Sequence, residues 1–120
     1  MSKHPVVHIE FSAIDRQAAG KFYQDVFGWK ITDIPEMNYT MFEYEDGRGG
    51  GFNSVTETNP AGTVIIYIEA EDIEATLSKI EENGGKVILP KSEIPNTGWY
   101  AFFTDPTGNQ VALYKSMTDG

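Results

Sequence analysis

The chain has no cysteine among its 120 residues, and this absence removes several chemistries at once. Disulfides, thiolate metal sites and a cysteine nucleophile are all excluded. Positive charge is also scarce, because 9 Lys and Arg stand against 18 Asp and Glu and the formal net charge is -9. Phosphate binding needs clustered Lys and Arg, so this balance disfavours nucleic acid and anionic membrane surfaces as partners.

Long apolar runs are absent as well. No stretch approaches the roughly 20 apolar residues needed to span a bilayer, and the first five residues lack the apolar core of a signal peptide. The composition, 40% hydrophobic and 12% aromatic, is sufficient for one packed core. We therefore expect a soluble, cytoplasmic, single domain over residues 1–120.

The first informative pattern is a strand at Pro5–Phe11. Side chains alternate along a strand, so His8 and Glu10 share one face while the other face is wholly apolar. The two ionisable residues are then about 7 Å apart along the strand, two residues at roughly 3.3 Å each. Such a pair could bind a divalent metal, transfer a proton, or simply form a hydrogen bond.

The remaining elements follow one order twice. Helical spacing of apolar residues predicts a helix from Ser12 or Asp15 to about Phe27, and a second helix over Asp72–Asn83. A strand at Thr63–Ala70 precedes the second helix, as the first strand precedes the first. The expected later strands are 29–33, 39–45 and 49–55 in the first half, and 86–89, 99–104 and 111–114 in the second. This is a βαβββ unit repeated.

The repeat divides the domain into two modules. Module one spans about residues 5–56, a polar linker covers 57–62, and module two spans about 63–115. Residues 90–98 are expected to be a polar connection between strands. Each module has one helix, which can cover one face of its sheet, so the two uncovered faces could enclose a cleft.

Several segments resemble the vicinal oxygen chelate superfamily, which includes glyoxalase I, bleomycin resistance proteins and extradiol dioxygenases. They are His8-Ile9-Glu10, the Phe22–Trp29 run and Asp105-Pro106-Thr107-Gly108-Asn109. The chain looks most similar to the small glyoxalase-related proteins of the superfamily. The resemblance implies an α+β fold in which two βαβββ modules form an incomplete barrel around a cavity, commonly as a homodimer.

The resemblance also implies four metal-ligand positions, two in each module. His8 occupies the first of them. The second falls near Gly51 or Phe52, the third near Ile65, and the fourth on Ala112. A metal enzyme needs about three protein ligands, so we expect no metal and no cofactor. A displaced site made of His8, Glu10 and Glu69 is the alternative.

Strand parity gives further candidates for a cavity wall. Ile65, Tyr67 and Glu69 lie opposite an apolar, helix-facing set on their strand, and Ala112 and Tyr114 do so on the last strand. Trp99–Phe103 is aromatic on both faces, so its inward side stays open. The candidate ligand-binding residues are His8, Glu10, Phe52, Ile65, Tyr67, Glu69, Tyr100, Phe102, Ala112 and Tyr114.

Three functions are compatible with these residues. The first is a metal-independent protein that binds a small aromatic or amphipathic molecule, with cationic ligands favoured by the acidic chain. The second is a lyase, isomerase or epimerase acting next to a carbonyl, with His8 or Glu10 as general base and Tyr67 as hydrogen-bond donor. No Lys or Arg falls on an assigned inward position, and metal-dependent glyoxalase I activity is not expected. The third is a regulatory or subunit module whose cavity is vestigial.

Overall fold

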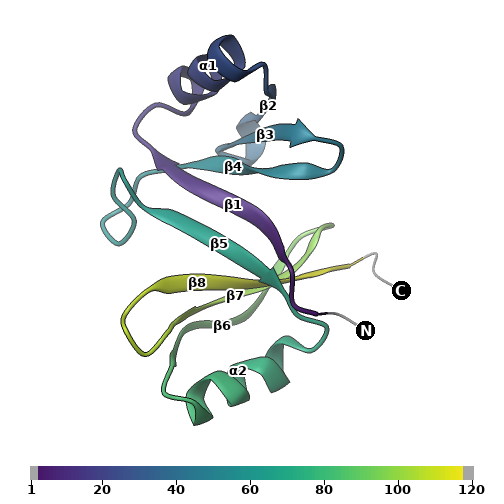
Figure 1. The fold of residues 1–120 in the computed structure, drawn as a ribbon, viewed down its shortest axis with the longest axis vertical. Helices are drawn as coiled ribbons and strands as arrows, with labels where there is room; N and C mark the ends of the chain where they lie inside the picture. Colours follow the sequence, from purple (N-terminus) through teal and green to yellow (C-terminus); the bar gives the residue numbers. More distant parts are fainter. Residues whose placement is uncertain (1–2, 118–120) are drawn as a thin grey trace. The chain divides into compact units, whose positions relative to one another are not determined.

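The computed structural model describes residues 3–117 and contains two compact units. The N-terminal unit is Val7–Ile65, and the C-terminal unit comprises the chain from Ile66 onward together with the segment up to Val6. Figure 1 shows a helix beside the strands in each of them. The two units are described separately below.

The N-terminal unit is a four-stranded sheet in the order β2-β3-β4-β1. Strand β1 is parallel to β4, while β3 is antiparallel to both β2 and β4. Its elements are β1 (Val6–Ala13), α1 (Arg16–Phe27), β2 (Lys30–Ile34), the short 3-10 helix η1 (Pro35–Met37), β3 (Tyr39–Glu45) and β4 (Arg48–Ser54).

The C-terminal unit repeats this arrangement, with the strand order β5-β8-β7-β6. Strand β5 is parallel to β8, and the remaining pairs are antiparallel. Its elements are β5 (Val64–Glu69), α2 (Ile73–Glu82), β6 (Lys86–Ile94), β7 (Gly98–Thr104) and β8 (Gln110–Ser116). The predicted βαβββ repeat is therefore confirmed.

Both helices begin where the sequence places an aspartate. Asp15 caps α1 and Asp72 caps α2, and each carboxylate accepts the backbone N–H of the residue three positions later at 3.0 Å. Helix α1 ends at Gly28, whose φ of 74° is the left-handed conformation that glycine adopts without strain. No helix within residues 3–117 is long and apolar enough to cross a membrane.

Each helix packs on one face of its own sheet. In the N-terminal unit Phe11 and Phe52 stack against Tyr23 of α1, with ring centroids 6.1 and 5.6 Å apart. In the C-terminal unit Ile73 and Leu77 of α2 pack with Ala101, Phe103 and Leu113 of the sheet. Each large apolar side chain buried in this way contributes about 1.5–3 kcal/mol to folding. The faces away from the helices are left for other contacts.

One expected boundary is wrong. Residues 90–94, predicted as a polar connection, continue β6 as far as Ile94. A proline inside a strand removes one backbone donor, but β6 pairs only with β7 in its unit, and its register shifts on either side of Leu89. Edge strands with bulges tolerate proline, so Pro90 does not end β6.

Candidate functional site

The site is built on the face of the N-terminal sheet that lies away from α1, which we call the His8 face. Residues paired across strands share a face, and Glu10 of β1 pairs with Gly51 of β4, which pairs with Met41 of β3. The next row on this face, two residues away along each strand, contains His8, Gly49 and Glu43. Alternation had predicted the shared face of His8 and Glu10.

A hydrogen-bonded chain joins three side chains on this face. His8 Nε2 and the Tyr39 hydroxyl are 2.7 Å apart, and that hydroxyl donates to Glu10 Oε1 at 2.9 Å. A phenol has one proton, so donation to Glu10 requires that His8 Nε2 donate to the Tyr39 oxygen. The imidazole nitrogen that faces Tyr39 therefore holds its own proton. Glu10, the last of the three hydrogen-bonded side chains, is buried at 7% exposure.

Tyr39 reaches its partners because Gly51 has no side chain. A Cβ built on Gly51 would overlap the Tyr39 ring, so any other residue there would displace it. Asn38, in the left-handed conformation at φ 51°, ends η1 and places Tyr39 at the start of β3. Sequence reasoning identified Tyr39 only as a strand residue. A glycine on the adjacent strand, opposite Glu10, is the signal that would have found it.

Burial sets the charge of His8. The ring is only partly accessible, and desolvation lowers the pKa of its imidazole from 6.5 to about 4. His8 is therefore neutral at pH 7. The neutral ring fits the hydrogen-bond chain, in which it donates through one nitrogen, and it lies roughly parallel to the Tyr39 ring at a centroid distance of 6.1 Å.

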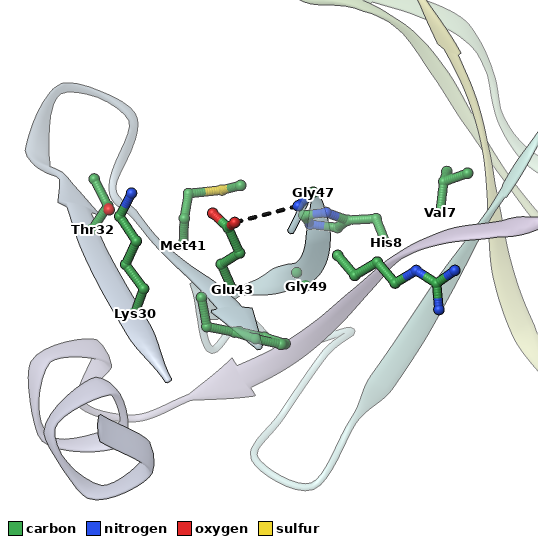
Figure 2. A pocket seen from close by; sticks show the side chains of 11 residues that line it. Val7, His8, Lys30, Thr32, Met41, Glu43, Gly47 and Gly49 are labelled. Carbon is green, nitrogen blue, oxygen red and sulfur yellow. Dashed lines mark hydrogen bonds between the residues drawn. The ribbon is translucent and has the colours of Figure 1, made fainter. Parts of the chain in front are cut away.

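A pocket of about 240 Å³ opens on the His8 face over the glycine-rich strand β4. Figure 2 shows His8 and Lys30 on opposite sides of it, with Met41 and Glu43 between them and Gly49 at the base. The full lining is Val7, His8, Lys30, Thr32, Met41, Phe42, Glu43, Gly47, Arg48, Gly49 and Gly50. Lys30 and Arg48 also line this pocket, and neither is among the inward positions that strand parity assigned from the sequence.

Phe52 is a second correction. It was predicted to line the site, but it is 1% exposed and stacks on Phe11 with centroids 5.7 Å apart, in the core beneath α1. The family resemblance had left two positions open, Gly51 and Phe52, and the register with Glu10 assigns Gly51 to the His8 face. Phe52 thus supports the site from the opposite side of the sheet.

The other predicted residues lie on the corresponding face of the C-terminal sheet, which we call the Tyr67 face. Tyr67 pairs with Ala112 and Ala112 with Phe102, while Glu69 pairs with Tyr114 and Tyr114 with Tyr100. Phe102 packs edge-on against both Tyr67 and Tyr100. Trp99 and Phe103 instead join the core against α2, which resolves the parity of β7. Ile65, 2% exposed, ends the N-terminal unit.

Comparison with known proteins assigns the family. The model of the Glyoxalase/Bleomycin resistance protein/Dioxygenase superfamily matches residues 6–113. The chain belongs to this superfamily. Its fold class, predicted from the sequence, is confirmed by the solved structure of protein BH1468 from Bacillus halodurans, with a TM-score of 0.74, 16% identity and 99% coverage of both chains.

Two curated superfamily relatives differ in how much of their length matches. The chain is 30% identical over 115 residues to CFP32 of Mycobacterium tuberculosis, covering 90% of this chain but 44% of that protein. It therefore spans less than half of that relative. It is 27% identical over 126 residues to the lactoylglutathione lyase of Haemophilus influenzae, covering 94% of this chain and 93% of the lyase.

The superfamily's metal positions can now be tested against the structure. Gly51, Ile65 and Ala112 have no donor atoms in their side chains, and the space above Gly51 is taken by the Tyr39 ring. Among residues 3–117, no group of three or more His, Cys, Asp or Glu could hold a metal ion. A donor set of this kind does not fit a metal site, which needs about three protein ligands.

Proposed function

We propose that this chain binds a small organic molecule without a metal, and that the His8–Tyr39–Glu10 chain orients the ligand's polar group. The observation that carries the proposal is Gly51. At the position where a metal ligand is expected by resemblance, the chain has a glycine, and the ring of Tyr39 lies over it with its hydroxyl bonded to His8 and Glu10. An organic hydrogen-bonding group thus stands in place of a ligand to a metal.

Binding is favoured over general-base catalysis by the state of His8. A general base is most effective when its pKa is near the working pH, and burial lowers the pKa of His8 to about 4. The neutral ring remains a good hydrogen-bonding group. A pocket lined by one neutral imidazole, a few charged residues and apolar residues such as Met41 has the composition of a small-molecule site.

The proposal predicts that this chain lacks the activity for which its Haemophilus relative is named. That name is lactoylglutathione lyase, and turnover of the hemithioacetal of methylglyoxal and glutathione is the direct comparison. We expect no turnover with added nickel or zinc, and no stoichiometric transition metal in elemental analysis of the purified protein. Turnover that depends on either added metal would overturn the proposal.

Ligand binding itself is tested by a titration screen followed by NMR, using aromatic and amphipathic compounds of all three charge states. Tyr39→Phe should weaken binding, because it breaks both hydrogen bonds of the chain while keeping the ring. Tyr44→Phe is the matched control, since Tyr44 belongs to the same strand and packs on Trp29, remote from the chain. Equal affinity of both variants and wild type would remove the triad from the site.

A second candidate function is proton transfer next to a carbonyl, as in an isomerase or epimerase. One observation favours it: the imidazole, phenol and carboxylate are connected, so a proton could move along the chain. Incubating 2-oxo acids with the protein in deuterium oxide tests it. Exchange at the carbon beside the carbonyl, lost in Glu10→Gln, would support the enzyme over the binding protein.

We propose a cytoplasmic homodimer as the working form. The superfamily resemblance supports a dimer, as do the exposed apolar side chains of α1, Phe22, Val26 and Phe27, which are 55 to 60% accessible. Light scattering after gel filtration should give twice the mass of the 13.4 kDa chain. A monomer at micromolar concentration would contradict this assembly. If no compound in any screen binds, the third hypothesis, a regulatory or subunit module with a vestigial cavity, would be favoured instead.

A further inference from the structure

Two cationic side chains line the pocket on the His8 face, although the chain as a whole is strongly acidic. Lys30 comes from β2 and Arg48 from the start of β4. Within residues 3–117 neither lies within 4.0 Å of an acidic group. Glu43 is the one acidic residue in the lining, and His8 is neutral at pH 7. The pocket therefore has a net charge of about +1 in a chain of net charge -9.

The other arginine of the chain has a structural role. Arg16 binds Asp33 at 3.1 Å and donates to the hydroxyl of the buried Thr40 at 3.0 Å, which fastens the start of α1 to the sheet. Arg48 is paired across strands with Glu45, but within residues 3–117 its side chain makes no hydrogen bond or ion pair. Arg16 thus stabilises the fold, whereas Arg48 lines the pocket.

Glu43 does not neutralise Lys30, even though the two residues are directly opposite each other on β3 and β2. Cross-strand partners of opposite charge commonly pair. Here one carboxylate oxygen of Glu43 instead accepts the backbone N–H of Gly47 in the hairpin turn, at 3.3 Å (Figure 2). This bond holds Glu43 toward the turn and leaves the Lys30 ammonium available to a ligand.

The base of the pocket is made of backbone. Gly49 occupies the row between His8 and Glu43, and it has no side chain to fill the space between them. Met41 provides an apolar wall beside it (Figure 2). A volume of about 240 Å³ is at the small end for ligand pockets, which are typically about 300–1,000 Å³. It suits a small molecule, or the charged end of a longer one.

We propose that this pocket binds the carboxylate of a small organic acid, held by Lys30 and Arg48, with the apolar part of the acid against Met41. The inference rests on the proposed small-molecule-binding function and assigns its ligand class. Ammonium and guanidinium groups form short, strong hydrogen bonds with carboxylates. A monoanion matches the local charge better than a doubly charged phosphate, which Glu43 would repel more strongly.

This inference reverses the ligand charge expected from the whole sequence. The net charge of -9 suggests cationic ligands, but exposed charges beyond about 10 Å are largely screened in physiological salt. The groups that line the pocket decide which ligand is held, and the overall charge affects mainly the rate of encounter. Local charge and total charge thus make opposite predictions, and one experiment separates them.

The test compares three probes with the same phenyl group: phenylpyruvate, its methyl ester and phenethylamine. Each is titrated into ¹⁵N-labelled protein, and amide shifts are followed by NMR. We expect phenylpyruvate to move the Gly47–Gly50 amides and to bind roughly tenfold more tightly than the ester, because the ester lacks the charged hydrogen bonds. Its affinity should fall as salt is raised.

Variants locate the effect. Lys30→Gln and Arg48→Gln should each weaken phenylpyruvate binding by roughly three- to tenfold and leave ester binding unchanged. Lys79→Gln, at an exposed position of helix α2, is the matched control and should change neither. Thermal melting confirms that each variant is folded. Equal or tighter binding of the ester or the amine by wild type would overturn the carboxylate inference while leaving small-molecule binding intact. Failure of all three probes would count against both.

Discussion

The two units have the same topology but contrasting sheet faces, and a few positions account for the difference. Aligning the register places Tyr39, Met41 and Glu43 of β3 at the positions of Tyr100, Phe102 and Thr104 of β7. On the neighbouring strands, Gly49 and Gly51 of β4 take the positions of Gln110 and Ala112 of β8. One face is polar and has glycine at its base, whereas the other is aromatic.

A single methyl group marks the contrast. Tyr39 lies over Gly51 and bonds to His8 and Glu10, but the equivalent Tyr100 has Ala112 in that place and packs edge-on against Phe102. His8 and Glu10 of β1 are matched in β5 by Ile65 and Tyr67, so the C-terminal face has no equivalent imidazole–carboxylate pair. The repeated scaffold fixes where side chains point, and glycine or its absence decides which of them meet.

The largest expected effect is the pH dependence of stability that His8 gives the N-terminal unit. Its folded pKa is about 4, against 6.5 in an unfolded chain. Well above pH 6.5, His8 is neutral in both the folded and the unfolded protein, and its contribution to stability is fully present. As the pH falls toward 4 the unfolded state takes up the proton first, so the free energy of unfolding decreases, by up to about 3 kcal/mol. Urea titrations between pH 7 and 4 measure it.

The control for this prediction is His8→Gln, which keeps a neutral donor for Tyr39 but cannot take up a proton in this range. The variant should show a much flatter profile between pH 6.5 and 4 than the wild type. A wild-type profile as flat as that of His8→Gln would mean that the imidazole is accessible enough to ionise in the folded protein.

The next effect comes from making the N-terminal unit resemble the C-terminal one. Gly51→Ala puts a Cβ into the Tyr39 ring. Overpacking of this kind typically costs about 1–3 kcal/mol, and here it also displaces the hydroxyl from His8 and Glu10. The reverse change, Ala112→Gly, removes one methyl from a buried position and should cost about 1 kcal/mol through chain entropy and lost packing.

Chemical denaturation gives the stability of both variants, and the NMR titration of His8 shows the displacement directly. We expect the imidazole of Gly51→Ala to be more accessible and its pKa to move back toward 6.5. If Gly51→Ala keeps the wild-type stability and the wild-type His8 titration, the Tyr39 ring does not need the glycine.

A smaller effect distinguishes the two tyrosines. Tyr39→Phe leaves the buried Glu10 without a donor that it has in the wild type, and such a loss costs about 1–3 kcal/mol, with the lower part of the range expected for a site that water can reach. Within residues 3–117 the Tyr100 hydroxyl makes no side-chain hydrogen bond, so Tyr100→Phe should change the free energy of unfolding by less than about 0.5 kcal/mol. Equal effects of the two substitutions would mean that the hydrogen bonds of Tyr39 to His8 and Glu10 do not stabilise the fold.

The sequence predicted those features that depend on local chemistry. Ser12 or Asp15 was predicted to start the first helix and Asp72 the second, and the structure caps the two helices with Asp15 and Asp72. Alternation put His8 and Glu10 on one face. These features depend on neighbours close along the chain. They are therefore visible without knowing how the strands pair.

The residues that sequence reasoning missed depend on register. Tyr39 is 29 residues from Glu10, and nothing local connects them until β1, β4 and β3 are paired in a given alignment. Lys30 enters the pocket through the same alignment, across Glu43 and Gly49. Phe52 was misassigned because a shift of one residue exchanges the two faces of a strand. Long-range pairing, which a single sequence does not reveal, decides all three.

The smallest expected effect belongs to the C-terminal unit and contrasts with that of His8. Asp105 accepts hydrogen bonds from the side chain and backbone of Asn109 and from Thr107, and these lower the pKa of its carboxyl to about 2. Its stabilising contribution is therefore complete above the ordinary pKa of 3.8 and is lost as the pH falls through 2. Because the group is fully exposed, the loss is small.

Acidification from pH 7 should thus weaken the protein in two steps, first through buried His8 and then through exposed Asp105. Asp105→Asn should remove the second step and leave the first, which an NMR titration of both side chains would resolve. A carboxyl at Asp105 that titrates near 3.8 would contradict the second step.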